Sequence, residues 1–432
     1  MQVSHYLKVF PFEERPGQLL VYSTKKASLL LLKEDIYRSI EKGTLSRADE
    51  ELLLKHGIIV PDREEEKRDM YGRLDKLNAK GSMMNVSVFL NMDCNFSCVY
   101  CYEGDMKGKL YMSDETAGLL IDFIKEKFTP GRKSLNIDFY GGEPLLSSGL
   151  IKYISGRLKS FAGSRGATYT FSLVTNGSLF KRQVAEEMIK LGLKGIKVTL
   201  DGPAEVHDRY RPFKSGTGSF DAIIRNIKET CDLVRIGIGG NFDRESYQGF
   251  ITLLDYLEKE GLSPDRIYQV KFGPVMKRPE GDTSPADYTD GFMSVNEPWL
   301  VEAGALLREE VLKRGYYTPK LKPLPCQVEV KDYYVVNYDG VIYKCPAFIG
   351  RKGFAAGNLR DGVRDYSDTY RTGIWKNEEC IECVYLPLCF GGCRYMAYVR
   401  DGSVNNKDCK KPYFDASLET LIKQDIKYRR KG

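Results

Sequence analysis

The fold of this chain is decided by one stretch, Asn91-Met92-Asp93-Cys94-Asn95-Phe96-Ser97-Cys98-Val99-Tyr100-Cys101-Tyr102, which directly follows the apolar run 86–90. Its three cysteines have C-x3-C-x2-C spacing. Thiolates are the soft ligands that iron–sulfur clusters and zinc prefer. A 4Fe–4S cluster has four irons, so three local thiolates leave one iron open to a small molecule. The alternative is a zinc site short of one ligand, and the histidines, His5, His56 and His207, lie far from the stretch.

Length and composition indicate a globular protein, with 432 residues of which 42% are hydrophobic and 29% charged. We find no run of eighteen or more apolar residues, and Met1-Gln2-Val3-Ser4-His5 begins no signal peptide, so we expect a cytoplasmic protein that contacts no membrane. In a reducing compartment, eleven cysteines indicate metal binding or catalysis rather than disulfides. The net charge is +6, and the basic residues are interleaved with acidic ones rather than gathered into one stripe. This pattern does not indicate nucleic-acid binding.

From residue 84 onward, predicted strands alternate with predicted helices. The strands are 85–90, 135–140, 168–174, 196–200, 234–239 and 267–272, and the helices between them are 114–128, 150–161, 181–191, 220–231 and 246–260. This alternation predicts the α/β class, with a parallel sheet covered by helices. Active sites of such sheets lie beyond the carboxyl ends of the strands, so motifs at those ends are the first candidates for function.

Polar motifs follow three more of these strands. Gly141-Gly142-Glu143-Pro144 follows the second strand; its glycines let a ligand approach the backbone, and its carboxylate can accept a hydrogen bond from an ammonium group. Thr175 and Asn176 end the third strand and offer a hydroxyl and an amide to a ribose or a carboxylate, with a plain Asn-Gly turn as the alternative. Asp201-Gly202-Pro203, continued by His207-Asp208 and Arg211, follows the fourth strand.

Together these motifs resemble the radical S-adenosylmethionine (SAM) superfamily, whose fold is an open (β/α)6 partial TIM barrel. The resemblance implies that Cys94, Cys98 and Cys101 ligate a 4Fe–4S cluster whose open iron binds SAM. It implies that Tyr100 lies against the adenine and that Gly141, Gly142, Glu143 and Pro144 hold the amino group of SAM. Arg211, in the segment that begins at Asp201, is the candidate contact to the SAM carboxylate. His207 is expected to hold its loop and not to act as a ligand or base.

The C-terminal part carries seven further cysteines. Their order is Cys326, Cys345 after Gly340, then Cys380-x2-Cys383-x5-Cys389-x3-Cys393, and finally Cys409, and these spacings resemble the signature of the SPASM domain. The resemblance implies two auxiliary 4Fe–4S clusters, one held by Cys326, Cys345 and Cys393 and the other by Cys380, Cys383, Cys389 and Cys409. The first cluster then has three ligands, and we hypothesise that its open iron binds a substrate thiolate or a loosely held ligand. Within this region, residues 335–345 predict a hairpin around Asp339-Gly340.

The N-terminal residues predict a small module of their own. Strands at 6–10 and 19–23 are followed by helices at 34–42 and 46–56, and this layout resembles winged-helix-like modules that bind leader peptides. A module that only packs on the main body is the alternative. The charge run 63–69 is interpreted as a solvated linker or helix face. The expected divisions are 1–75 for the module, 84–290 for the barrel, 291–325 for a bridging region with a helix at 297–313, 326–412 for the SPASM domain and 413–432 for a C-terminal helix. A polar loop at 277–285 is expected to face the mouth of the site.

The resemblance implies a chemistry. A reduced cluster cleaves SAM to methionine and a 5′-deoxyadenosyl radical, which abstracts a hydrogen atom, and auxiliary clusters are natural acceptors of the next electron. The leading hypothesis is an enzyme that matures a ribosomally made precursor peptide by forming thioether links at cysteine. Its partners would be that peptide, with a leader bound by residues 1–75, and a flavodoxin or ferredoxin as reductant.

Two alternatives stay open. One is an anaerobic sulfatase-maturating enzyme that oxidises cysteine or serine to formylglycine; such enzymes carry an aspartate directly after the equivalent of Cys345, where this chain has Pro346. The other is a non-catalytic iron–sulfur electron carrier or a zinc-stabilised binding protein. The motifs from Gly141 to Glu143 and from Asp201 to Arg211 count against it, because a carrier needs no SAM site.

Overall fold

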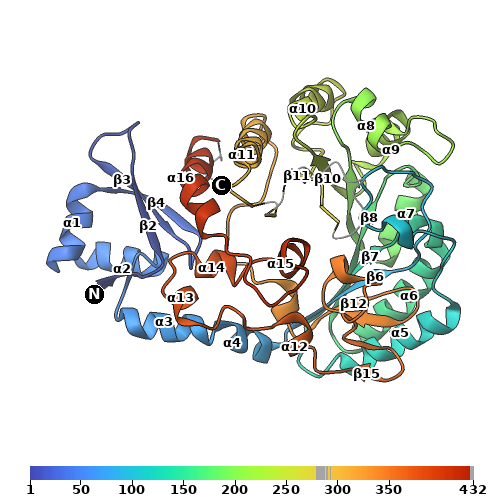
Figure 1. Ribbon diagram of the computed structural model, residues 1–432, viewed down its shortest axis with the longest axis horizontal. Coiled ribbons are helices and arrows are strands. Elements are labelled where there is room, and N and C mark those ends of the chain that lie inside the picture. Colours follow the sequence, from blue (N-terminus) through green and yellow to red (C-terminus); the bar gives the residue numbers. More distant parts are fainter. Residues whose placement is uncertain (279–287, 289, 292, 429–432) are drawn as a thin grey trace.

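The computed structural model describes residues 1–278, 288, 290, 291 and 293–428. At its centre lie six parallel strands that are neighbours in sequence order: β6 (Met83–Phe89), β7 (Ser134–Tyr140), β8 (Thr168–Thr175), β9 (Leu193–Thr199), β10 (Arg235–Phe242) and β11 (Gln269–Pro274). All six agree with the predicted strands to within a few residues. In the described part of the chain β6 and β11 do not pair with each other, so the barrel is open as predicted (Figure 1).

Helices connect successive strands and cover the outside of the sheet. They are α5 (Asp114–Lys127), α6 (Ser148–Ser164), α7 (Arg182–Leu191), α8 (Ala204–Tyr210), α9 (Phe220–Thr230) and α10 (Gly249–Lys259). Alternate residues of β7, such as Leu135, Ile137 and Phe139, are fully buried beneath these helices. The residues between them point to the inner face of the sheet, which carries many polar side chains. The inner face of this barrel therefore offers polar groups that can bind a ligand.

The central sheet continues beyond β6 into the C-terminal cysteine region. The predicted hairpin forms as β12 (Tyr333–Val336) and β13 (Val341–Tyr343), and β12 pairs in parallel with β6, from Tyr333 opposite Asn85 onward. This pairing could not be predicted from the sequence, because nothing local in either strand encodes it. The short elements that follow are η4 (Pro346–Phe348), β14 (Gly357–Asn358), β15 (Gly362–Val363), α12 (Ser367–Tyr370), α13 (Glu378–Ile381), α14 (Leu386–Cys389) and α15 (Arg394–Asp401).

The N-terminal module has more elements than its sequence predicted. β2 (Leu7–Pro11), β3 (Gln18–Ser23), α1 (Glu34–Lys42) and α2 (Arg47–His56) are the predicted ones, and Ser46 caps α2 by accepting from the amide of Asp49. The missed strand β4 (Ser28–Lys33) completes a three-stranded sheet of order β2-β3-β4. The short strands β1 (Gln2–Val3) and β5 (Ile59–Val60) pair beside it.

The charge run 63–69 lies in a helix, α3 (Arg63–Tyr71), which α4 (Arg73–Lys80) follows. The interpretation as a purely solvated face is wrong at one position. Glu66 is only 4% exposed, and its carboxylate accepts hydrogen bonds from the Ser4 hydroxyl, the His5 amide and Lys25. This charge is retained because it holds the first residues of the chain against α3.

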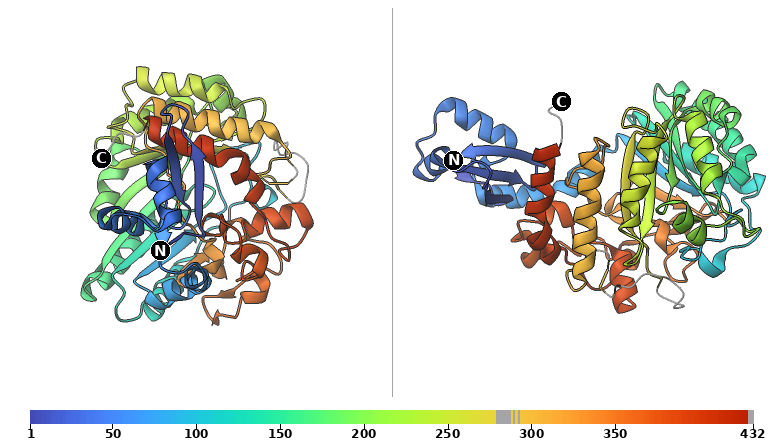
Figure 2. Two further views of the ribbon diagram at one scale, coloured as in Figure 1. Left: turned by 90° about the vertical axis from the view of Figure 1, so that its left-hand side faces the viewer. Right: turned by 90° about the horizontal axis from the view of Figure 1, so that it is seen from above.

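The C-terminal region lies between the N-terminal module and the barrel (Figures 1 and 2). One face of the module's sheet packs against α14 and the C-terminal helix α16 (Lys411–Tyr428), burying Leu20, Tyr385 and Phe414 in one cluster. The Thr24 hydroxyl donates to the carbonyl of Val384 over 2.6 Å. α16 in turn contacts the bridging helix α11 (Pro298–Lys313). The module is thus anchored on the cysteine region.

Two expectations reach beyond the described residues. Most of the polar loop 277–285 and the last four residues of the chain lie outside them. Within the described part of the chain, no helix is both long enough and apolar enough to span a bilayer.

Candidate active site

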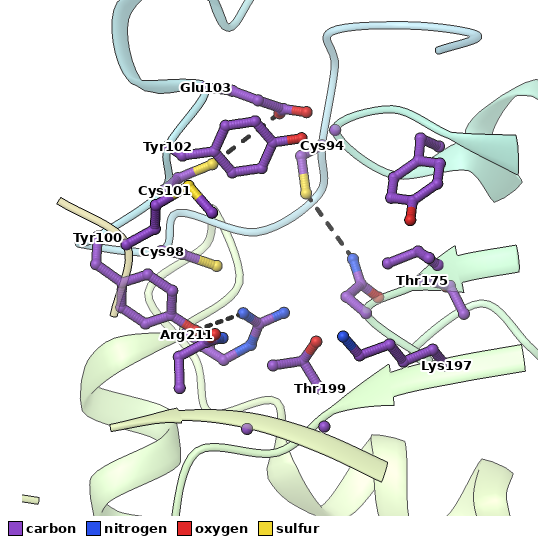
Figure 3. A pocket seen from close by; sticks show the side chains of 18 of the residues that line it. Cys94, Cys98, Tyr100, Cys101, Tyr102, Glu103, Thr175, Lys197, Thr199 and Arg211 are labelled. Carbon is purple, nitrogen blue, oxygen red and sulfur yellow. Dashed lines mark hydrogen bonds between the residues drawn. The ribbon is translucent and has the colours of Figure 1, made fainter. Parts of the chain in front are cut away.

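A cavity of about 470 Å³ opens at the carboxyl ends of the six parallel strands. The loop after β6 contributes Cys94, Cys98, Tyr100 and Cys101, and the following strands contribute residues such as Gly141, Gly142, Thr175, Asn176 and Thr199. Figure 3 shows the three thiols and the guanidinium of Arg211 around this space. The structure thus brings residues predicted after four different strands to one pocket, whereas Glu143, Pro144 and Asp201 are buried and do not line it.

The three loop thiols are free and lie at the pocket wall. Burial raises the pKa of Cys94 to about 11 and raises that of Cys98. A nearby positive charge is therefore needed to stabilise these two cysteines as thiolates. Lys107, which sequence analysis missed, lines the same pocket, and the thiolates of Cys101, Cys98 and Cys94 raise its pKa against the effect of burial.

This donor set fits a cubane cluster better than a single metal ion. Among the residues that the structure describes, no three His, Cys, Asp or Glu side chains are arranged to hold one ion. A 4Fe–4S cluster takes each thiolate on a different iron, so its ligands need not converge on one point.

The two glycines of the Gly-Gly-Glu-Pro motif hold the cysteine loop close. A Cβ on Gly142 would lie 2.2 Å from the carbonyl oxygen of Asp93 and 3.1 Å from the Cβ of Cys94, so only glycine fits there. The backbone amide of Gly142 donates to Asn91 and that of Glu143 to Asp93, over 3.1 and 2.8 Å. The glycines were expected to let a ligand come close to the backbone. In the structure Gly142 instead lies against the loop that carries the thiols.

Glu143 is fully buried and binds protein donors. Its carboxylate accepts from the Thr175 hydroxyl over 2.7 Å, the Asn176 amide over 2.8 Å and the Leu145 amide over 3.1 Å. Burial raises its pKa, and these donors lower it. Two carboxylate oxygens offer about four acceptor positions, so one remains for an ammonium group.

Tyr100 links the cysteine loop to the fourth and fifth strands. Its hydroxyl donates to the carboxylate of Asp201 and accepts from Arg211 over 2.7 Å and from the Asn241 side chain over 3.1 Å. Arg211 also lies 3.9 Å from Asp201, and its buried Nε has no hydrogen-bond partner among the described residues. His207 holds its loop, as expected: one ring nitrogen accepts from the amide of Asp201, and the other contacts Ser219.

Sequence analysis missed several charged residues of the pocket. Lys197 and Lys271 lie on inner positions of β9 and β11, and Glu103 follows the cysteine loop. Burial raises the pKa of Glu103 to about 7. The only signal in the sequence was the alternation of polar and apolar residues along each strand. That alternation does not distinguish a lysine on a solvent-facing position from a lysine that faces the inside of a barrel.

The seven C-terminal cysteines fall into two spatial groups. Burial raises the pKa of Cys345, and the neighbouring thiolates of Cys326 and Cys393 raise it further. Burial likewise raises the pKa of Cys380, Cys383 and Cys389, and the charge of Cys409 adds to each. These are the same two sets that the SPASM resemblance assigns to two clusters.

The first of these groups adjoins the pocket. Pro346 and Ala347, which directly follow Cys345, form part of the pocket wall. A buried ion pair joins the segments that carry two of these cysteines. Glu329, three residues after Cys326, binds Arg394, which directly follows Cys393. The second group lies on the side of the N-terminal module, where Tyr6, Met70 and Trp375 pack around Cys380.

Residues 90–257 match the family model described as the radical SAM superfamily. Among curated proteins, the Fe-coproporphyrin III synthase of Methanosarcina barkeri is 29% identical over 182 residues, which are 41% of this chain and only 42% of that enzyme. The cysteine-type anaerobic sulfatase-maturating enzyme of Clostridium novyi is 22% identical over 372 residues, which are 78% of this chain and 96% of that enzyme.

Among solved structures, SuiB of Streptococcus suis, bound to the precursor peptide SuiA, has the same fold with a TM-score of 0.55 and 15% identity. The match covers 94% of this chain and 98% of SuiB. The match therefore spans nearly the whole of both chains.

Proposed function

From the radical SAM domain that residues 90–257 form, we propose that this chain is an oxidising maturase of a ribosomally made precursor peptide. The radical SAM superfamily consists of enzymes that bind a 4Fe–4S cluster and SAM. In this proposal Cys94, Cys98 and Cys101 hold that cluster. When bound, it and SAM supply a 5′-deoxyadenosyl radical as the hydrogen acceptor, and auxiliary clusters supply an acceptor for the second electron.

The residues around the thiols bind and orient SAM. The free acceptor position of Glu143 suits the amino group of SAM, beside the backbone of Gly141 and Gly142. Thr175 and Asn176 offer polar groups at the end of β8, and Arg211, whose Nε has no partner in the described part of the chain, offers a donor to a carboxylate. The buried hydrogen bonds of Tyr100 to Asp201 and Arg211 hold this side of the pocket in place before any ligand arrives.

The C-terminal cysteines would hold two auxiliary clusters. The group of Cys326, Cys345 and Cys393 suits the first, and Cys380, Cys383, Cys389 and Cys409 suit the second. A thioether link between cysteine sulfur and carbon removes two hydrogens from the peptide, one as an atom and one as a proton with an electron. A three-cysteine site next to the pocket leaves room for the substrate thiolate itself.

The N-terminal module supports a peptide substrate. In the described chain β4 is an edge strand of its sheet, so its outer backbone groups can pair with an added strand, a common mode of peptide recognition. The whole-chain likeness to SuiB, whose structure holds a precursor peptide, supports a peptide substrate as well. The observation that carries the proposal is the open edge strand β4 on a module that Thr24 anchors to the cysteine region and Tyr22, through the carbonyl of Leu321, anchors to the bridging region.

Formylglycine formation is the second candidate, favoured by the similarity to the Clostridium novyi enzyme along nearly its whole length. Against it stands Pro346, at the pocket wall where sulfatase maturases carry an aspartate. A proline cannot accept a proton, so that candidate needs another base.

The test is anaerobic turnover of the reconstituted, reduced protein with SAM and the precursor peptide encoded beside its gene. The expected result is 5′-deoxyadenosine together with a peptide that has lost two hydrogens per modification and whose cysteines no longer alkylate. A peptide aldehyde that reacts with hydrazine would support formylglycine formation. Deoxyadenosine with an unchanged peptide would refute both peptide reactions, and the Cys98→Ser variant should form no deoxyadenosine.

A further inference from the structure

Two lysines lie inside the barrel beneath the cysteine loop. Lys197 belongs to β9 and Lys271 to β11, and both line the pocket. The strand between them, β10, places Gly237 opposite Lys197 and Gly239 opposite both Thr199 and Lys271. Figure 3 shows the Lys197 side chain extending into the pocket next to Thr199.

The glycines of β10 make room for these long side chains. A Cβ on Gly239 would lie 2.7 Å from Cε of Lys197, so a larger residue there would displace the lysine. Since neither glycine carries a side chain, nothing on β10 separates the two lysines at this level of the barrel. The fold thus places two lysine side chains along one wall of the pocket, and both remain accessible to solvent.

Within the described residues these charges have no acidic partner. No ion pair joins a carboxylate of that part of the chain to either lysine, and burial and the charge of Lys271 lower the pKa of Lys197, with no carboxylate opposing them. Asp138, on the inner face of β7, binds the Ser172 hydroxyl instead. Two like charges on one pocket wall repel each other, and a bound anion offsets that repulsion.

We propose that Lys197 and Lys271 form a carboxylate-binding pair that holds an acidic group of the peptide substrate, an Asp or Glu side chain or the C-terminus. This inference rests on the proposed peptide function and specifies its substrate class. The Lys197 backbone lies two residues before Thr199, about 7 Å deeper in the barrel at the usual rise of a strand, and its side chain reaches up to the level of Gly239. A carboxylate held there would anchor the peptide below the thiols and fix which neighbouring residue faces the site of hydrogen abstraction.

SAM carries a carboxylate too and is the other source of the same chemistry. The first experiment therefore compares Lys197→Met and Lys271→Met in two measurements: the Kd for SAM, by equilibrium dialysis with the reconstituted protein, and the KM for the precursor peptide. Methionine keeps the length of the side chain and removes its charge. Lys194→Met is the matched control, since Lys194 lies on the same strand and does not line the pocket.

The expected result is a KM for the peptide that rises about ten- to a hundredfold in each pocket variant, the usual weight of a hydrogen bond to a charged group. The Kd for SAM stays within about twofold, and Lys194→Met changes neither. A charge exchange sharpens the test: Lys197→Glu should accept a peptide in which the responsible acid is replaced by lysine. A parallel loss of SAM affinity would assign the pair to SAM and overturn the proposal, as would an unchanged KM.

A second measurement does not depend on turnover. Acetylation of each lysine is followed by mass spectrometry in the presence of acetyl-Cys-Glu-amide or acetyl-Cys-Gln-amide at equal concentration. We expect the glutamate peptide alone to slow the acetylation of Lys197 and Lys271 severalfold, with Lys194 unaffected as an internal control. Equal rates with both peptides would overturn the carboxylate pair. Selective protection without any peptide modification would keep the pair and refute the proposed function.

Discussion

The hydroxyl of Tyr100 and Nη1 of Arg211 are 2.7 Å apart, in a buried contact that joins the cysteine loop to the segment after the fourth barrel strand. Asp201, from the same segment as Arg211, and Asn241, on the fifth strand, complete the contact. A SAM site assembled from loops that are far apart in sequence needs such a connection, because each loop alone is free to shift. The tyrosine hydroxyl is the atom that all three partners share.

Tyr100→Phe should therefore weaken SAM binding more than it weakens the fold. The variant removes one hydrogen bond each from Arg211, Asp201 and Asn241, although the Asp201 carboxylate keeps the Asn241 amide as a donor. We expect a loss of about 1–3 kcal/mol in stability and a Kd for SAM about tenfold higher. Tyr210→Phe is the control, because Tyr210 gives its hydroxyl to Asp243 and does not line the pocket. Equal SAM affinity in both variants would show that the Tyr100 contact does not organise the site.

Gly142→Ala should abolish cluster assembly at the cysteine loop. The added Cβ meets the backbone of Asp93, which cannot move aside as a flexible side chain can. After reconstitution we expect about four irons fewer per chain, the content of one 4Fe–4S cluster. Gly156→Ala, on α6 with open space around the new Cβ, should keep all iron and gain up to about 1 kcal/mol in stability. Full iron content in Gly142→Ala would contradict the close-approach role.

Glu329→Gln should destabilise the C-terminal region strongly. Arg394 and Glu329 have side chains only 1% and 6% exposed, and removing the negative charge leaves the guanidinium buried without compensation. We expect the free energy of unfolding to fall by about 3–5 kcal/mol in urea titrations. The double variant Glu329→Leu with Arg394→Met should recover much of the loss, whereas Glu34→Gln, in an exposed pair, should change stability by less than about 0.5 kcal/mol.

Cys380→Ser should loosen the N-terminal module as well as remove iron. Cys380 packs against the hydrophobic residues Tyr6, Met70 and Trp375. Loss of the iron–sulfur cluster that Cys380 would ligate therefore removes support from the N-terminal module. Hydrogen exchange should become faster over residues 1–24 and 377–389. Cys326→Ser removes a thiol from the other group and should leave exchange in residues 1–24 as in the unaltered protein. Similar exchange in both variants would show that the module does not depend on the second cysteine group.

Much of this architecture could be predicted from the sequence, for identifiable reasons. Alternating strand and helix periods gave the six barrel strands, because each buries one face under helices. The motif at Gly142 and the cysteine motifs could be found because the residues that act together in them stand at fixed spacings in the sequence. β4, by contrast, was missed because its four successive leucines, 29 to 32, show no alternation.

The charged floor of the pocket could not be predicted in the same way. Lys197 and Lys271 occupy strand positions that would face water in a flat, one-sided sheet, and only the curvature of the barrel turns them toward a common chamber. The burial of Glu66 likewise depends on the first residues of the chain returning to α3. Each of these follows from contacts between distant segments.

The pairing of β12 with β6 has a consequence for how the protein is made. A ribosome releases β6 early, and β7 covers one of its edges soon afterward, but the strand that covers the other edge emerges only after the whole barrel sequence. During that interval the nascent barrel presents an apolar strand with open backbone groups, the kind of surface that pairs with neighbouring chains. Fragments that stop before residue 333 should therefore aggregate, and overproduction should benefit from slow translation or from chaperones that shield nascent strands.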